Sequence, residues 1–140
     1  MGADKLIYSY EASVNAVMRF GDTYIISAAG NPTINKNLRG YNCTLKVWNC
    51  TTGAIEQTLT GHEDQVTAVA VLDHQLIVSA SEDHTLKVWN LATSNVIASI
   101  KLDAALYCLA FVRQKDRNLV VAGGRVGALY CLELVEPMGE

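Results

Sequence analysis

One short stretch of sequence occurs twice, and its spacing sets the strongest limit on the fold. Residues 42–49 read Asn-Cys-Thr-Leu-Lys-Val-Trp-Asn, and residues 83–90 read Asp-His-Thr-Leu-Lys-Val-Trp-Asn. Trp48 and Trp89 are therefore roughly 40 residues apart, a period that is typical of repeat architectures. A third, more divergent copy at 128–133 reads Ala-Leu-Tyr-Cys-Leu-Glu. The spacing predicts an array of similar units rather than one irregular domain.

Each unit consists of short β-forming runs and shows no sustained helical period. In the middle unit, the pattern predicts strands at about 66–71, 75–80, 85–90 and 96–101, separated by turn residues such as Asp73. We refer to the four strands of a unit as a to d. Four short antiparallel strands in each repeat predict an all-β propeller built from four-stranded blades. The predicted blades are 11–60, 61–101 and 102–135, within a single domain that spans 1–140.

The middle unit carries the residues that mark WD repeats. Gly61-His62, Ser79, Asp83 and Trp89-Asn90 resemble the Gly-His, Ser, Asp and Trp-Asp signature of that family, with Asn in place of the last Asp. The resemblance implies that His62, Ser79, Asp83 and Trp89 form a hydrogen-bonded structural tetrad within the blade. It also implies a non-catalytic protein that binds other proteins or peptides. A hydrolase triad would use the same residue types, but the structural role accounts for all of them.

The other two units depart from this signature. The first has Ser27 and Trp48, but Asn42 and Tyr10 stand in the places of the Asp and the His, which predicts a partial tetrad. The third has apolar residues at the four places and is predicted to be held by apolar packing alone; they are Leu102, Ala122, Val126 and Leu132.

The final unit carries a second resemblance. Residues 119–134 are similar to the closing blade of propellers in NACHT-type signalling ATPases. This implies a ligand-sensing module whose ATPase lies outside the chain, because the chain contains no phosphate-binding loop of its own. The leading interpretation is therefore a protein-interaction scaffold or a ligand-sensing module, and the alternatives are the sensor propeller of such an ATPase and a substrate adaptor of a ubiquitin ligase.

Three blades do not close a ring, since propellers have four to eight of them. Residues 5–10 align with 56–61 and predict a d strand ahead of the first blade, whereas the third unit ends after its c strand. In complete WD propellers, a strand in this position completes the last blade. We therefore expect either a homo-oligomer, in which copies join head to tail through this strand, or further blades outside the chain.

WD propellers usually bind partners on the face that carries the d–a loops and the b–c turns, and loops on a rigid scaffold are suited to binding. By alignment, the d–a loops display Glu11, Ser13, Glu63, Gln65, Asp103 and Ala105, and the b–c turns display Tyr41, Glu82 and Arg125. The mostly acidic set favours a basic or mixed peptide; a solvated rim is the alternative.

An insertion at 29–39 lengthens the first b–c loop and extends from the same face. Inserts in repeat proteins often lie on the binding face, although long surface loops are also tolerated without a function. The candidate partner contacts in this insertion are Ile34, Lys36, Leu38 and Arg39.

Composition argues against several other functions. The net charge of −3 disfavours nucleic-acid binding, and neither a membrane-length apolar run nor a signal peptide is present, which predicts a cytoplasmic protein. The four cysteines include no Cys-x-x-Cys pair, so zinc is not expected, and a disulfide framework is not expected because nothing marks the chain as secreted. Cys108 and Cys131 are predicted to be small core residues. The predicted inner strands carry no converging carboxylates or histidines, so no cofactor, metal or propeller-type catalytic centre is expected.

Overall fold

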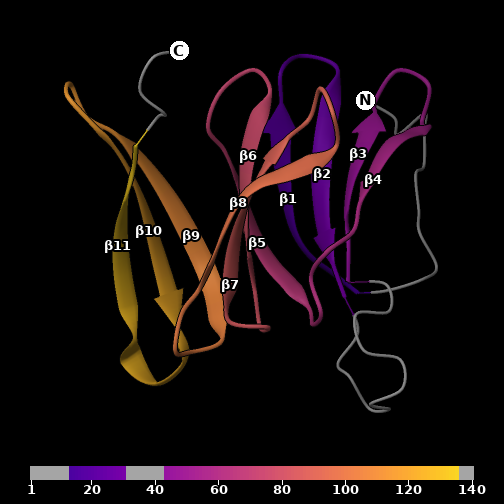
Figure 1. The fold of residues 1–140 in the computed structure, drawn as a ribbon. Helices are drawn as coiled ribbons and strands as arrows, with labels where there is room; N and C mark the ends of the chain where they lie inside the picture. The colour runs from indigo at the N-terminus through magenta and orange to yellow at the C-terminus, as the bar shows by residue number, and fades with distance from the viewer. Residues whose placement is uncertain (1–12, 31–42, 136–140) are drawn as a thin grey trace, which may run out of the picture.

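The structure is a computed structural model that describes residues 13–30 and 43–135 as three twisted antiparallel sheets standing side by side (Figure 1). The first sheet contains β1 (Val14–Phe20), β2 (Tyr24–Ala29), β3 (Leu45–Asn49) and β4 (Ile55–Leu59). The second contains β5 (Val66–Val71), β6 (Leu76–Ser81), β7 (Thr85–Asn90) and β8 (Asn95–Lys101). The third contains β9 (Leu106–Arg113), β10 (Asn118–Gly124) and β11 (Leu129–Leu134), with a short 3-10 turn at Arg125–Gly127.

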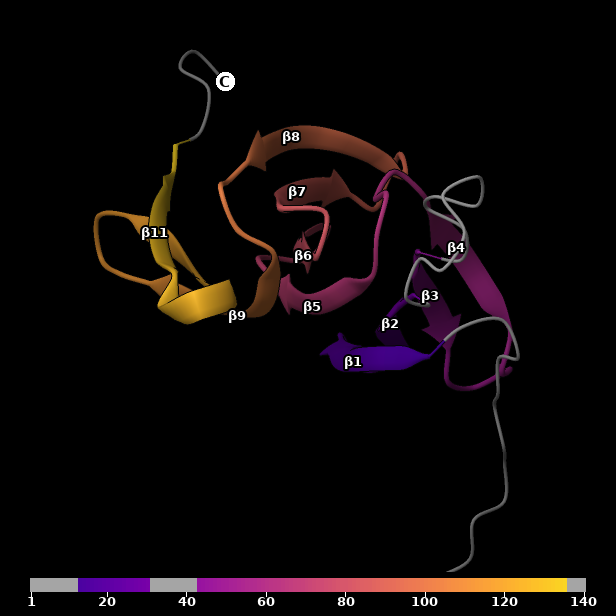
Figure 2. The same cartoon turned by 90° about the horizontal axis from the view of Figure 1, so that it is seen from below.

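The sheets are the blades of a propeller segment, which confirms the predicted fold class. Figure 2, which looks along the strands, shows β1, β5 and β9 innermost, with β4 and β8 on the outside. In each blade the strands lie side by side in the order in which they occur in the sequence, because short turns join antiparallel neighbours. Among the described residues the third blade has three strands rather than four, which agrees with the sequence pattern of 102–135.

Several strand boundaries differ slightly from the sequence pattern. Strand β6 begins and ends one residue later than predicted, at Leu76 and Ser81, and strand β8 begins one residue earlier, at Asn95. Ala29 belongs to β2, because it pairs with Val14 and its backbone N–H donates to the carbonyl of Thr44 at 3.0 Å. The b–c insertion therefore cannot begin at Ala29. The other predicted features of this part, the insertion residues 31–39 and the d strand at 5–10, lie outside the described residues.

The middle blade is buried on both faces, and this explains its nearly continuous apolar strands. One cluster between the first and second sheets contains Ile26, Leu45 and Val66 together with Trp89. A second cluster between the second and third sheets is built around Val78, Leu86, Leu106 and Val120. Successive residues of β5 point to opposite sides, so Val69 packs in the first cluster and Ala70 in the second.

The far side of the third blade is open among the described residues. Leu109 and Phe111 of β9 pack against the second blade, so the residues that alternate with them face away from it. Val112 is 39% exposed and Leu129 is 73% exposed. Cys108 and Cys131 are exposed for the same reason, so the prediction that they are core residues is wrong.

Candidate functional site

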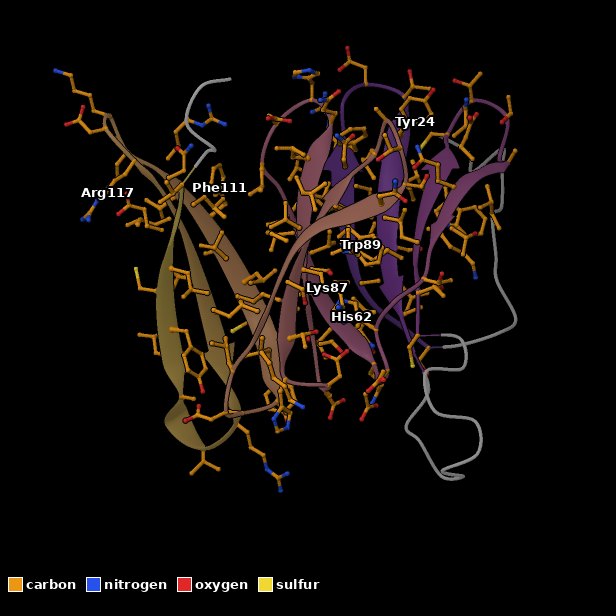
Figure 3. All side chains as sticks on the ribbon, in the orientation of Figure 1. Tyr24, His62, Lys87, Trp89, Phe111 and Arg117 are labelled. Atoms are coloured by element: carbon orange, nitrogen blue, oxygen red, sulfur yellow. The ribbon has the colours of Figure 1, made fainter. Side chains whose placement is uncertain are left out.

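The structure brings the four signature residues of the middle blade together. His62, just before β5, places Nε2 2.7 Å from the hydroxyl of Ser79 on β6, and the Trp89 indole N–H donates to the same hydroxyl at 2.8 Å. The other ring nitrogen, Nδ1, lies 2.9 Å from a carboxylate oxygen of Asp83. Figure 3 shows His62 close to Trp89 within the second blade. Every polar atom in this chain of contacts has a partner, as buried polar groups require.

Asp83 is the centre of this network. Its carboxylate also accepts hydrogen bonds from the backbone N–H groups of Glu63 and Thr85, each at 2.9 Å. Burial alone would raise the pKa of Asp83, but hydrogen bonds from His62 and Thr85 outweigh it and hold the pKa well below its ordinary value. Asp83 is therefore a carboxylate at neutral pH, and its side chain is only 8% exposed.

The same geometry argues against a hydrolase triad. Ser79 is 0% exposed, and its hydroxyl already contacts both His62 and Trp89. A nucleophile must be able to reach a substrate, which a hydroxyl enclosed in this way cannot do. The arrangement joins the loop before β5 to β6 and β7, and it is a structural element.

The first blade keeps part of this arrangement. The indole N–H of Trp48 donates to the hydroxyl of Ser27 at 2.9 Å, which repeats the Trp89 contact. Thr44 occupies the place of Thr85, but its buried hydroxyl oxygen has no hydrogen-bond partner among the described residues. The other two predicted members, Tyr10 and Asn42, lie outside the described residues.

The third blade uses apolar packing, with one exception to the prediction. Leu102, Ala122 and Leu132 all belong to or pack against the cluster shared with the second blade. Val126, predicted at the Asp place, is instead 95% exposed and has a positive φ of 58° in the turn before β11. Its side chain cannot pack because the turn directs it into solvent.

Neighbouring blades are also joined by side-chain hydrogen bonds that sequence reasoning did not find. The amide of Asn15 donates to the carbonyl of Val66 at 2.9 Å, and the hydroxyl of Thr67 donates to the carbonyl of Leu106 at 2.7 Å. Asn15 and Thr67 occupy the same place in the recurring first-strand segment, and Tyr107 occupies it in the third blade. Tyr107 is 45% exposed. The only signal in the sequence was a polar residue recurring inside an apolar strand.

With the exception of Ala105, the predicted partner residues that the structure describes lie at the end of the blades that carries the d–a loops and b–c turns. We call this end the loop face; its described members are Ser13, Glu63, Gln65, Glu82, Asp103 and Arg125. Four of them are exposed, whereas Gln65 and Glu82 are half-buried and joined by a hydrogen bond of 2.7 Å. Ala105 is only 7% exposed and does not belong to this surface, because it is packed beneath Gly124 and Arg125.

Charge is unevenly distributed over the loop face. Burial and the nearby carboxylate of Asp64 raise the pKa of Glu82, although Arg125 acts in the opposite direction. Asp103 is exposed and accepts a hydrogen bond from the phenol of Tyr130.

The other predicted contact residues lie outside the described part of the chain; they are Glu11, Ile34, Lys36, Leu38, Arg39 and Tyr41.

Residues 13–30 and 43–135 contain no helix with the length and apolar character needed to cross a membrane. Within the same ranges, no three His, Cys, Asp or Glu side chains are grouped so that they could hold a metal ion.

Comparison with known proteins identifies the family. The family model described as the TEP-1 C-terminal beta-propeller matches residues 62–134, just over half of the chain. The chain belongs to this family of WD-repeat β-propellers. The match begins at His62 of the tetrad and ends at the last residue of β11.

Relatives of this WD-repeat propeller are longer proteins. It is 29% identical over 114 residues to "Nuclear distribution protein nudF" of Aspergillus niger, covering 70% of this chain and 25% of that protein. It is 34% identical over 101 residues to "CCR4-associated factor 4 homolog" of Candida glabrata, covering 72% of this chain and 17% of that protein. The chain thus spans a quarter or less of these two relatives.

A solved structure shows the same fold. The WD40 beta propeller domain of Doa1 superposes with a TM-score of 0.70 at 22% sequence identity. The alignment covers 88% of this chain and 37% of that domain's chain. The three blades therefore have the arrangement of consecutive blades in a larger propeller.

Proposed function

We propose that this chain is a non-catalytic protein-interaction module whose loop face binds a basic or mixed peptide of a partner protein. One observation carries the proposal: the acidic loop residue Glu63 is exposed directly beside the buried tetrad. Glu63 is adjacent to His62, and its backbone N–H is fixed by the carboxylate of Asp83. Its side chain is exposed while its backbone is held in place, which is the usual basis of binding by loops on a rigid scaffold.

Charge reversal at Glu63 tests this role. With the chain as bait, proteins enriched by the wild type are expected to be retained about threefold to tenfold less by the Glu63→Lys variant, because rim charges steer association. Asp116→Lys is the matched control, since Asp116 is also exposed but lies in the turn between β9 and β10, at the other end of the blades. Quantitative mass spectrometry of the three eluates measures the effect. Identical eluates from all three baits would contradict the proposed binding face.

A second candidate function is that of a ligand-sensing propeller within a nucleotide-switched signalling ATPase. Two observations favour it. The matching family is described as a C-terminal propeller, and the chain covers only a fraction of its relatives. In this form the loop face binds the sensed ligand, and the ATPase lies in another part of a longer protein.

We also propose that copies of the chain assemble head to tail. Within the described residues, one edge of β11 is unpaired, and the outer side of the third blade exposes Leu129 and Val112. At the opposite end of the segment, Val14 and Val17 of β1 are 51% and 60% exposed. A second copy placed after the third blade would pack the apolar side of its first blade against the apolar side of that third blade. The backbone carbonyl of Val14 in the second copy would then occupy the position equivalent to the carbonyls of Val66 and Leu106, each of which accepts a hydrogen bond from the preceding blade.

Solution mass tests the assembly. Light scattering after size-exclusion chromatography is expected to show a discrete dimer or trimer that dissociates when residues 1–10 are removed, because these residues are proposed to complete a neighbour's third blade. Leu129→Glu is expected to have the same effect, since burying an unpaired charge is costly. Val126→Glu is the matched control, because Val126 is exposed in the adjoining turn. A monomer for the intact chain would contradict the assembly.

A further inference from the structure

A hollow surface lies at the end of the blades opposite the loop face. Two adjoining hollows of about 300 and 450 Å³ share Phe20, Tyr24 and His74. They lie between the β1–β2 turn of the first blade and the β5–β6 turn of the second. Figure 3 shows Tyr24 at one end of the blades and His62 near the other. We call this surface the aromatic groove, defined by Phe20, Tyr24, Glu56, His74 and Leu91.

The floor of the aromatic groove is apolar and firmly held. Val47 and Leu91 line it and are only 2% and 6% exposed, and both belong to the cluster between the first two blades. Phe20 and Tyr24 pair across the β1–β2 hairpin, with ring centroids 6.4 Å apart and planes inclined by 49°. Both rings are half-buried, so each presents part of its surface to the hollow.

The rim of the groove is negatively charged. Glu56 of β4 lines one hollow, and Asp22 and Asp73 line the other, whereas none of the described lysines and arginines lines either. Asp22 is paired with Arg19 at 2.8 Å. In the described part of the chain, Glu56 and Asp73 form no ion pair, although Glu56 accepts a hydrogen bond from Asn49 at 3.1 Å.

Two polar side chains of the groove are also available to a ligand. Within residues 13–30 and 43–135, neither the phenol of Tyr24 nor the ring of His74 makes a hydrogen bond. A largely apolar hollow of a few hundred Å³ with a small number of convergent polar groups is the usual form of a ligand pocket. Because carboxylates predominate on the rim, a positively charged ligand is expected to bind more strongly than a neutral or negatively charged one.

We propose that the aromatic groove binds an arginine or lysine side chain from an extended segment of a partner protein. The aliphatic stem of such a side chain would pack on Leu91 and the aromatic rings, as long basic side chains do on apolar surfaces. Its charged head would lie over the ring of Tyr24, which attracts cations, and near the carboxylate of Glu56. The groove is formed by the first two blades alone, so this site is separate from the loop face and independent of how the ring is completed.

Two fluorescein-labelled peptides test the proposal. One is Gly-Ala-Leu-Arg-Leu-Ala-Gly, and the other replaces arginine with citrulline, which has nearly the same shape and no charge. Fluorescence polarisation with the full chain is expected to show binding of the arginine peptide and at least about tenfold weaker binding of the citrulline peptide, because charge-assisted contacts are lost. Equal binding of the two peptides, or no binding of the arginine peptide at millimolar protein, would overturn the proposal.

Variants locate the binding to the groove. Glu56→Gln and Tyr24→Leu are each expected to weaken binding of the arginine peptide about threefold to fivefold, through the lost charge and the lost ring respectively. Asp116→Asn is the matched control and is expected to leave binding unchanged, because Asp116 is an exposed carboxylate of the β9–β10 turn and lines neither hollow. Thermal unfolding of each variant verifies that the blades remain folded. If Asp116→Asn weakened binding as much as Glu56→Gln does, the groove would not be the site.

Discussion

Replacing Asp83 with alanine is expected to lower the free energy of unfolding by about 3 kcal/mol, because several buried donors would lose their acceptor at once. The carboxylate accepts from the ring of His62 and from the backbone N–H groups of Glu63 and Thr85. Urea unfolding followed by tryptophan fluorescence measures the loss, since Trp89 lies in the same network.

Asp116→Ala provides the control for this experiment. Asp116 is exposed in the turn between β9 and β10, so its removal is expected to change stability by no more than about 0.5 kcal/mol. If the two variants unfolded at the same urea concentration, the network around Asp83 would contribute nothing to stability.

The pH dependence of the free energy of unfolding provides a second test, on the wild type and the Asp83→Ala variant. Asp83 has a lower pKa in the folded chain than its ordinary 3.8, so the unfolded chain takes up the proton more readily. The stabilisation is therefore fully present above about pH 5 and decreases as the pH falls through about 4 toward the folded-state pKa. The Asp83→Ala variant is expected to lack this component, so the stability difference between wild type and variant should shrink in acid.

Replacing Gly30 with alanine is expected to cost about 3 kcal/mol, because the added carbon would overlap the backbone of the next blade. A Cβ built at Gly30 would lie 2.6 Å from the Cα of Gln65, which belongs to the loop before β5. A backbone atom cannot relieve an overlap by a rotamer change as a side chain can, so the first two blades would have to move apart. The change should appear in the urea midpoint and in the thermal midpoint.

Gly127→Ala separates this overlap from the general effect of losing a glycine. Gly127 has a positive φ of 76°, and nothing lies within 4 Å of the carbon that alanine would add. Its replacement is expected to cost only about 1 kcal/mol of backbone strain. A loss at Gly30 that is no larger than the loss at Gly127 would contradict close contact between the first two blades at this point.

The repeat period and the family signature were enough to predict the blades and the residues of the tetrad. His62, Ser79, Asp83 and Trp89 are predictable because each matches a residue type that the signature requires at a fixed place. The predictions for Cys108 and Cys131 were wrong for a physical reason: alternation shows that a strand has two faces, but it does not show whether a neighbouring sheet covers both.

Other features depend on contacts between segments that sequence patterns treat separately. The hydrogen bonds of Asn15 and Thr67 are accepted by backbone carbonyls. Any residue type has such a carbonyl, so the accepting position cannot be recognised from the sequence. The aromatic groove combines turns from two blades, and neither turn has a motif of its own. Val126 aligns with an Asp position, but its exposure follows from the conformation of its turn.

The side-chain bonds between blades have a consequence for how such a chain can evolve. In both cases the donor belongs to the earlier blade, and the acceptor is a main-chain oxygen at the start of the later blade's first strand. Every amino acid supplies that oxygen, so the later blade needs no matching substitution to receive the bond. A blade can therefore be duplicated, deleted or exchanged by recombination while this connection is kept, which favours growth of the array by whole units.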